Sequence, residues 1–277
     1  MKTFLITGGT SGIGRETVRQ LALTGATVVF TARDADKGEA TKKDIIDETG
    51  NKAVEYLVCD LASFSSIRAC AEEFKKRYAH LDGLINNAGV LPQERQESKD
   101  GIELNLAVNY LAPFLLTNLL LPLLKRSVPA RIVNVSSSLH TEGQIDFADL
   151  QSEKSFDKYR AYAQSKLALI LFTKKLAKEL AGTGVTVNAL HPGVIGTEMT
   201  MQNVRKMNPI AAFFFKRTLI SPKQGAETSV YLATDPAVEG VTGEYFIGKK
   251  EAEPAPQTSD AATANRLWEV AAKRVGL

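Results

Sequence analysis

Cysteine and histidine are scarce in this chain of 277 residues, which has two of the first and three of the second. Cys59 and Cys70 lie far apart in the sequence, as do His80, His140 and His191, so neither residue type has the spacing of a metal site. Two cysteines also make no disulfide framework, and we expect both to be reduced thiols of a cytoplasmic protein. The composition therefore predicts neither a bound metal nor a covalent staple.

The chain also lacks a strong charge imbalance. Its 34 basic and 31 acidic residues leave a net charge of +3, too small and too evenly spread for a nucleic-acid-binding surface. The hydrophobic share of 44% and the charged share of 23% are ordinary for a globular chain that buries a core unaided. We expect a strand from residue 3 onward, and hence no signal peptide at the start of this sequence.

One long uncharged run, residues 104–124, tests this interpretation because its 21 residues could cross a bilayer. A helix buried on most sides inside a protein explains the same pattern, and a membrane span here would interrupt the alternation of strands and helices. We therefore expect no transmembrane span. The run also contains residues that lipid tolerates poorly, namely Asn105, Asn109, Pro113, Asn118 and Pro122.

Short β-branched runs alternate with amphipathic stretches along the whole chain. Most of the expected strands are apolar throughout, as a parallel sheet covered by helices on both faces requires. Right-handed crossovers then predict an α/β fold, a single Rossmann-type domain over 1–277 with a doubly wound parallel sheet of about seven strands. The segment 198–221 breaks the alternation and is expected to be an insertion. Strands are expected at 3–7, 27–31, 53–58, 83–86, 131–136, 186–190 and 244–247, and helices at 13–24, 36–49, 64–78, 102–125, 159–181, 222–233 and near 267–275.

A glycine-rich turn, Thr7 to Gly14, follows the first strand and opens the first helix. Gly8 permits a tight turn, Gly12 lets the backbone approach a pyrophosphate, and Gly14 allows the helix to pack closely on the strand. The helix N-terminus presents free N–H groups to the anion. Together these features predict a dinucleotide site.

The end of the second strand indicates which dinucleotide. An acidic residue there bonds the ribose 2′-hydroxyl of NAD, but Ala32 occupies that place and Arg33 follows it. A guanidinium suits a 2′-phosphate, and Arg15 could add a second positive charge. Asp34 lies close enough to weaken the preference. The sequence favours NADP(H) over NAD(H).

Tyr162 and Lys166 stand four residues apart in an expected helix, so their side chains share one face. A tyrosine with its ordinary pKa exchanges protons poorly at neutral pH, and a neighbouring ammonium favours the phenolate. We expect Lys166 to lower the pKa of Tyr162 into the range of a general acid and base. Taken alone, this pair is equally typical of an exposed helix surface.

Further polar groups follow the ends of the other expected strands, at the edge where open α/β sheets bind their ligands. Their order along the chain makes a chance match implausible. They are Asp60-Leu61, Asn86 to Gly89, Ser136 to Ser138 and His191 to Thr197, with Asn109 in the helix after the fourth strand.

Taken together these motifs resemble the short-chain dehydrogenase/reductase family, of the T-G-x-x-x-G-x-G and Y-x-x-x-K type. The resemblance runs from Thr7 to about Ile247 and is nearest to the retinol-dehydrogenase-like branch, notably at 84–90, 108–117 and 131–137 and in the tail at 267–270. It implies an NADP(H)-dependent enzyme that interconverts a carbonyl, as an aldehyde or ketone, and an alcohol.

The resemblance also assigns roles. Tyr162 exchanges the proton of the substrate oxygen, Lys166 supports Tyr162 and holds the nicotinamide ribose, Ser137 bonds the substrate oxygen, and Asn109 supports a water that feeds protons to Lys166. The expected cofactor-binding residues are Gly8, Thr10, Ser11, Gly12, Ile13, Gly14, Arg33, Asp60, Leu61, Asn87, Ala88, Gly89, Tyr162, Lys166, Pro192, Gly193, Val194 and Thr197.

The sequence leaves open which serine is catalytic and what the two nearby histidines do. Ser137 is preferred as the catalytic serine because its separation of 25 residues from Tyr162 matches the branch pattern, with Ser136 and Ser138 as alternatives. The longer separation places an extra loop, about 140–158, beside the substrate. His140 and His191 are expected to line the pocket or to be structural.

The role of the insertion at 198–221 has three possible interpretations, and the oligomeric state is a separate expectation. The insertion carries methionines and Phe213 to Phe215, which fit a lid over an apolar substrate, simple packing on the domain, or a membrane-surface contact. The helix that holds Tyr162 is apolar on more than one face, which predicts a homodimer or homotetramer.

Two other functions compete with an oxidoreductase. The first is a sensor of the same fold that binds NADP(H) without catalysis, but loss of Tyr162 or Lys166 would have favoured it and both are present. The second is an epimerase or dehydratase, whose glycine motif usually reads G-x-x-G-x-x-G and whose C-terminal part is larger.

Overall fold

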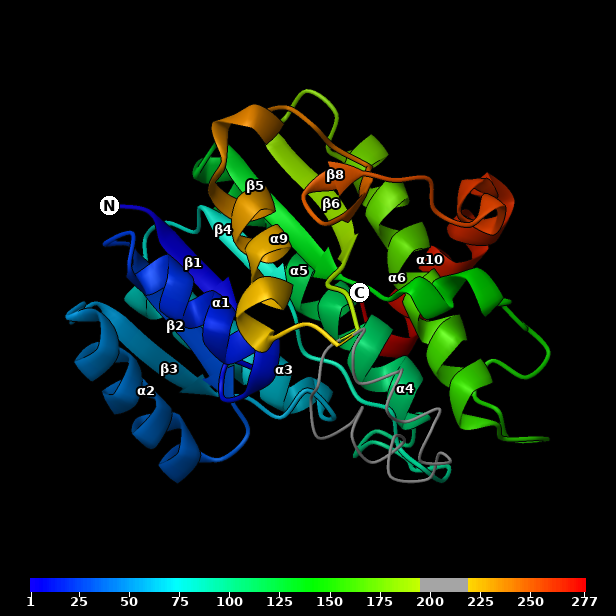
Figure 1. Ribbon diagram of the computed structural model, residues 1–277. Helices are drawn as coiled ribbons and strands as arrows, with labels where there is room; N and C mark the ends of the chain where they lie inside the picture. Colours follow the sequence, from blue (N-terminus) through cyan, green and yellow to red (C-terminus); the bar gives the residue numbers. More distant parts are fainter. Residues whose placement is uncertain (195–218) are drawn as a thin grey trace.

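An eight-stranded sheet runs through the centre of the computed structural model, which describes residues 1–194 and 219–277 (Figure 1). The strand order is β3-β2-β1-β4-β5-β6-β7-β8, in which β1 to β7 are parallel and β8 is antiparallel to β7. This confirms the doubly wound α/β fold. The strands are β1 Thr3–Ile6, β2 Thr27–Ala32, β3 Val54–Val58, β4 Gly83–Asn86, β5 Ala130–Val135, β6 Val185–His191, β7 Tyr245–Ile247 and β8 Lys250–Glu251.

The eighth strand was not expected from the sequence. β8 has two exposed residues and returns along β7, with Ile247 opposite Lys250. Nothing apolar marks such a strand, because its side chains stay in water and only backbone pairing defines it.

Helices cover both faces of the sheet, as Figure 1 shows. On one face α1 packs against α9 and α2 lies over β3, while on the other α3 packs against α5 and α6 lies over β6. The helices are α1 Gly12–Ala22, α2 Ala35–Thr49, α3 Phe64–Arg77, α4 Leu104–Leu106, α5 Ala112–Arg126, α6 Lys158–Glu179, α9 Pro222–Thr234 and α10 Ala261–Val275, with a π-helical turn η1 at Ala107–Leu111 and 3₁₀ turns η2 Ser138–Glu142, η3 Pro236–Val238 and η4 Pro256–Ser259.

The strand order reverses between β1 and β4, which are neighbours in the sheet but lead to helices on opposite faces. Divergence of these two connections opens a crevice at the carboxyl ends of the strands, where open α/β sheets bind ligands. The glycine-rich turn follows β1 and residues 87–89 follow β4, so both border this crevice.

The uncharged run forms one helix from Leu104 to Arg126, built from α4, η1 and α5. By length and composition it could cross a membrane, but 78% of its most apolar window is buried within the protein. This burial agrees with the expected core helix.

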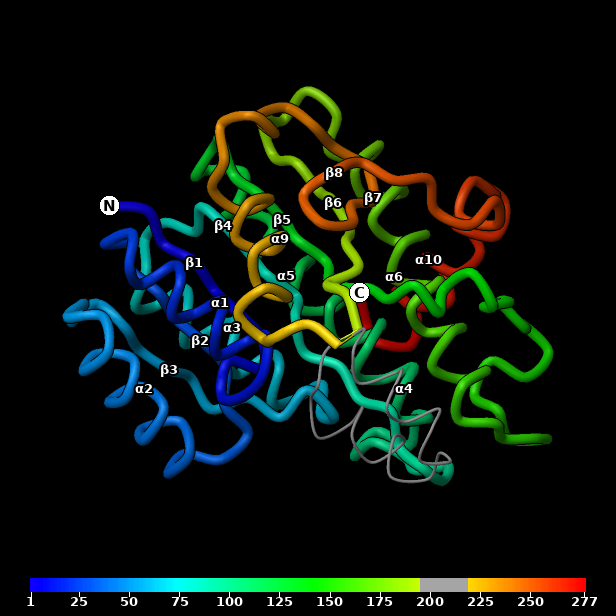
Figure 2. Tube along the Cα trace, viewed as in Figure 1, coloured from blue at the N-terminus to red at the C-terminus, as the bar shows by residue number. Residues whose placement is uncertain are grey.

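The C-terminal helix α10 covers the apolar surface shared by α5 and α6 (Figure 2). Leu267 is buried in this contact, and the Trp268 ring lies 4.9 Å from that of Phe114 and 5.7 Å from that of Phe172. The second apolar face of the Tyr162 helix is thus covered by the chain's own tail, because residues 261–275 fold back across it. That face no longer argues for an oligomer.

Candidate active site

The glycine-rich turn after β1 is shaped by contacts that exclude side chains. Gly8 and Gly12 have φ of 69° and 54°, in the left-handed region that favours glycine. A Cβ on Gly14 would stand 2.1 Å from the carbonyl oxygen of Gly8. The backbone therefore lies bare at the start of α1, as a phosphate cradle requires.

The N-terminus of α1 leaves donors for such an anion. The exposed Ser11 is its N-cap residue, and no side chain caps the first N–H groups of the helix. Thr10 and Ile13 flank this position on the same turn. Open amides at a helix N-terminus fit a pyrophosphate.

Two threonine hydroxyls, not expected as site residues, hold this turn against its neighbours. Thr7 Oγ1 accepts the N–H groups of Asn87 and Ala88, both at 3.0 Å, and Thr31 Oγ1 accepts the N–H of Gly8 at 3.0 Å. Asn87 in turn donates through Nδ2 to the Thr7 carbonyl. The sequence does show a threonine at the end of each of these strands, Thr7 at β1 and Thr31 at β2, and this pattern could have identified both residues.

At the end of β2 the cation of Arg33 and the carboxylate of Asp34 have different surroundings. Ala32 is buried and Arg33 is exposed, while Asp34 accepts the N–H of Lys37 at 2.8 Å as the N-cap of α2. Asp34 is thus engaged in capping. Arg15, which could add a second positive charge, forms an ion pair with Glu48 on α2.

Asp60 stands at the turn between β3 and α3, next to Leu61. Burial raises the pKa of its carboxyl, but bonds from Lys99 and from the Ala62 N–H and the charges of Lys99 and Arg33 outweigh it, so the pKa is lowered. Lys99 Nζ lies 2.9 Å from Asp60 Oδ2. The carboxylate is therefore ionised at the turn that follows β3.

Tyr162 and Lys166 share one face of α6, as expected, and meet Ser137 from the end of β5. The Ser137 side chain lies beside that of Tyr162, close enough to lower the pKa of the phenol. Lys166 is only 3% exposed, and its Nζ lies 5.6 Å from the centre of the Tyr162 ring. Two elements thus bring three polar groups to one point on the carboxyl edge of the sheet.

The expected direction of the Tyr162 pKa is wrong for this arrangement. Burial raises the pKa of Tyr162 to about 12, against the lowering influence of Ser137. Lys166 does not offset this rise, and its Nζ donates to the Val135 carbonyl oxygen at 2.9 Å. Burial also lowers the pKa of Lys166 to about 8.

Asn109 lies in the π-helical turn and is fully buried. Its side chain bonds both backbone groups of Val90, with Oδ1 accepting at 2.8 Å and Nδ2 donating at 3.0 Å, and it also donates to Ser165 Oγ. A Cβ on Gly89 would stand 3.2 Å from Lys166 Nζ. Asn109 therefore shapes the turn that borders Lys166, and its support of a water stays a prediction.

The three serines have different surroundings. Ser136 is buried and donates to the Lys166 carbonyl oxygen at 3.0 Å, whereas Ser138 is exposed. Of the three, it is Ser137 whose side chain influences the pKa of Tyr162, and its Oγ accepts the N–H of Leu139 at 3.2 Å. The structure thus places Ser137, the serine preferred from spacing, beside Tyr162.

The loop after β6 brings Pro192 and Gly193 to the same edge. Gly193 has φ of 92°, and Val194 accepts the N–H of Ile220 at 2.9 Å. Thr197 and residues 198–218 of the insertion, including Phe213 to Phe215, lie outside the described residues.

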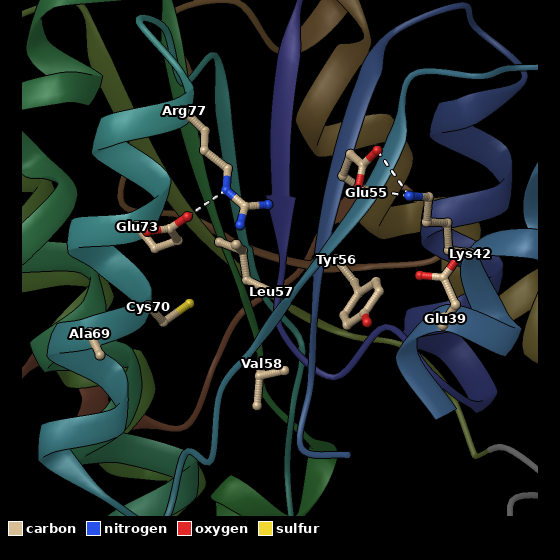
Figure 3. A pocket seen from close by; sticks show the side chains of 10 residues that line it. All are labelled: Glu39, Lys42, Glu55, Tyr56, Leu57, Val58, Ala69, Cys70, Glu73 and Arg77. Carbon is tan, nitrogen blue, oxygen red and sulfur yellow. Dashed lines mark hydrogen bonds and ion pairs between the residues drawn. The ribbon is translucent and has the colours of Figure 1, made fainter. Parts of the chain in front are cut away.

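A separate hollow of about 560 Å³ lies on the outer edge of the sheet, between α2, β3 and α3 (Figure 3). At its border Lys42 of α2 pairs with Glu55 of β3, and Arg77 pairs with Glu73 along α3. Charges along an edge strand discourage pairing with another chain, which explains this surface without a ligand. Within the part of the chain that the structure describes, no group of His, Cys, Asp or Glu could hold a metal.

Comparison with known proteins now identifies the family. The family model of the short chain dehydrogenases matches residues 2–208. Retinol dehydrogenase 13 of Mus musculus is 45% identical over 281 residues, covering all of this chain and 84% of its own. Retinol dehydrogenase 14 of Homo sapiens is 43% identical over 294 residues, covering 100% and 87%.

Solved structures agree. An uncharacterised protein from Mycobacterium paratuberculosis is 31% identical with a TM-score of 0.81, covering 100% of this chain and 94% of its own. A short chain dehydrogenase from Escherichia coli CFT073, complexed with NADPH, is 28% identical with a TM-score of 0.74, covering 90% and 97%. The chain belongs to the short-chain dehydrogenase/reductase family, in its retinol-dehydrogenase-like branch, and is an oxidoreductase that acts on CH–OH groups.

Proposed function

We propose that this enzyme uses NADP(H) to interconvert an apolar aldehyde or ketone and its alcohol, with Tyr162 as general acid and base. The observation that supports this most directly is the position of the Ser137 side chain beside Tyr162, with Lys166 Nζ 5.6 Å from the centre of the tyrosine ring. All three groups lie at the edge of the sheet that also carries the glycine-rich turn.

The cradle fits a dinucleotide, because the bare backbone at Gly8 and Gly14 and the open N–H groups of α1 can hold a pyrophosphate. Asp60 would reach the adenine, and Asn87, Ala88, Gly89 and the 192–194 loop would line the nicotinamide half. When bound, the cofactor supplies or accepts the hydride.

The side chains provide orientation and the proton. Ser137 Oγ accepts from Leu139, so its own O–H can donate to the substrate oxygen and stabilise the charge that develops there. In reduction the protonated Tyr162 phenol donates its proton to that oxygen, and in oxidation the phenolate removes it. Lys166 must leave the Val135 carbonyl to lower the Tyr162 pKa and bond the ribose.

Arg33 supports the choice of NADP(H). It is exposed, the buried Ala32 stands where NAD enzymes carry an acid, and Asp34 is engaged in capping α2. The similar Escherichia coli enzyme was solved with NADPH. The names of the relatives identified above, together with the methionines and phenylalanines of 198–221, support a lipid-like or retinoid-like substrate beneath a lid.

The first test is an assay of aldehydes, ketones and alcohols, including all-trans-retinal and retinol, followed by nicotinamide absorbance with both cofactors. Replacing Tyr162 by Phe should lower kcat at least 100-fold, since general acid–base catalysis contributes roughly 10² to 10⁴. Tyr159→Phe, exposed on the same helix, is the matched control. Full activity of Tyr162→Phe would contradict the mechanism, and cofactor binding without turnover of any compound would favour the sensor.

The second test replaces Arg33 by Ala. Loss of a charge-assisted bond to a phosphate should weaken NADP(H) roughly 10-fold or more and leave NAD(H) nearly unchanged. Lys43→Ala, which removes an exposed cation on the nearby helix α2, controls for general charge. Equal losses for the two cofactors would remove the argument for NADP(H).

Location and assembly stay proposals. We infer a cytoplasmic enzyme, which cell fractionation tests. A homodimer or homotetramer has to use a surface other than the one α10 covers, and light scattering over a range of concentrations decides this.

A further inference from the structure

Two of the three histidines hold the two ends of a single peptide group, the one between Ser137 and Ser138. The carbonyl oxygen of Ser137 lies 2.6 Å from His140 Nδ1, and the N–H of Ser138 donates to His191 Nδ1 at 3.2 Å. The same carbonyl accepts the backbone N–H of His140 at 3.2 Å. His140 comes from η2 and His191 from the end of β6, so two separate elements grip one peptide plane.

The protonation of His140 follows from its partners. The backbone N–H of Ala255 donates to His140 Nε2 at 3.0 Å, so Nε2 carries no proton. The single proton of the neutral ring therefore sits on Nδ1 and is donated to Ser137. The ring is 1% exposed and packs edge-on against Tyr245, with ring centres 4.9 Å apart.

His191 has the opposite tautomer. Its Nδ1 accepts from Ser138, so its proton sits on Nε2. Burial, with a smaller influence from His140, lowers the pKa of His191 to about 4, and burial lowers that of His140 as well. Both rings are neutral at pH 7, and in each the nitrogen without a proton already accepts a backbone N–H, which leaves it no free lone pair to act as a general base.

The gripped peptide controls where the Ser137 hydroxyl points. Ser137 Cα ends this peptide, and its Oγ accepts the Leu139 N–H and lies beside Tyr162. Because the held plane and strand β5 are joined through Ser137, the plane fixes ψ of Ser137 and with it the position of Cβ and Oγ relative to the plane. A change in ψ would therefore shift Oγ relative to Tyr162. A displacement of about 1 Å at a reacting group can cost about 100-fold in rate.

We propose that His140 and His191 are positioning residues that clamp the Ser137–Ser138 peptide and so aim the Ser137 hydroxyl at the substrate oxygen. The clamp rests on the proposed function in one respect only, that the group at which Ser137 is aimed is the substrate oxygen. It also connects the serine to the segment at Ala255 and, through His191, to the loop that begins at Pro192.

The clamp is tested first without any substrate. Long-range ¹⁵N–¹H NMR of the imidazole rings at pH 7 should show one histidine protonated on Nδ1 and one on Nε2, assigned by single His→Gln variants. His80 is exposed, and its variant removes the third signal. A charged ring, or the reverse tautomer at either position, overturns the clamp whatever the enzyme turns over.

The kinetic test compares asparagine and glutamine substitutions, whose side-chain amides lie at different distances from the backbone. An asparagine amide stands where histidine has Nδ1, and a glutamine amide stands where it has Nε2, while glutamine is the closer match in volume. His140→Asn and His191→Asn keep the bond to the clamped peptide, and should retain kcat within about threefold. His140→Gln and His191→Gln lose that bond, and kcat should fall about 100-fold with KM little changed.

His80→Gln is the matched control and should behave as wild type. Gln variants as active as the Asn variants, with melting temperatures equal to wild type, would overturn the proposal. Gln variants that are more active than Asn variants would show that packing volume, and not the clamp, matters at these positions. If Tyr162→Phe is fully active while the tautomers are as expected, the proposed mechanism fails and the clamp stands.

Discussion

Lys166 is a buried cation whose ammonium bonds a neutral acceptor, the Val135 carbonyl oxygen. Because burial lowers its pKa to about 8, the folded protein holds the charged form at a cost in free energy. Sites that must move protons carry such costs, since a group at its ordinary pKa exchanges protons too rarely at neutral pH.

This cost predicts a pH dependence of stability. The folded pKa of Lys166 lies below the unfolded one, so between about pH 8 and 10.5 the unfolded chain binds more protons and stability rises with pH. Relative to Lys166→Met, the wild-type free energy of unfolding should be flat below pH 8. Above it, wild type should gain up to roughly 3 kcal/mol.

Urea unfolding at pH 7, 8.5 and 10 measures this difference. Lys178→Met, exposed on the same helix, should follow the wild-type curve. A constant difference between wild type and Lys166→Met over this range would show that Lys166 is not desolvated.

At the scale of elements, the start of α1 depends on what its glycines leave out. Gly14 has its missing Cβ against the Gly8 carbonyl, so the helix approaches the β1 turn as closely as two backbones can. The same closeness exposes the N–H groups that would hold a pyrophosphate.

Gly14→Ala should therefore abolish cofactor binding and lower stability, because the turn must move to admit the methyl group. Gly25→Ala lies beyond the other end of α1, where an added methyl group meets no atom within 4 Å. The only cost there is the positive φ of 79°, which alanine adopts less readily than glycine. We expect that control to cost about 1 kcal/mol and to keep cofactor binding. Fluorescence titration with NADPH distinguishes the two, and equal affinity in both variants would mean the turn is not the cradle.

At the scale of the whole molecule, α10 completes the core by covering α5 and α6. Tyr110 donates to the Leu267 carbonyl at 3.2 Å, and Trp268 closes over Phe114 and Phe172. A surface that another chain could have covered is thereby buried within this one.

Leu267→Glu should undock this helix. The free energy of unfolding should fall by roughly 2–5 kcal/mol, and the mass from light scattering should rise with concentration as the apolar face is exposed. Glu269→Gln, exposed on the same helix, should change neither. A Leu267→Glu variant as stable as wild type would show that α10 lies outside the cooperative core.

Much of the molecule follows from sequence alone, because local patterns carry it. Apolar strands, helical periodicity and the Thr7–Gly14 turn predict the doubly wound sheet, and strand ends predict which edge bears Tyr162, Lys166 and Ser137. These inferences need only the chain direction and the rule that parallel strands end at one edge.

Contacts between segments that are far apart in the chain could not be predicted from the sequence. Arg15 pairs with Glu48 on α2, α10 occupies the face argued for a partner, and burial raises the Tyr162 pKa that Lys166 was expected to lower. The histidine clamp is of the same kind, since His140, His191 and Ala255 meet only in the folded chain. Desolvation and hydrogen bonding depend on which atoms become neighbours, and only tertiary structure determines that.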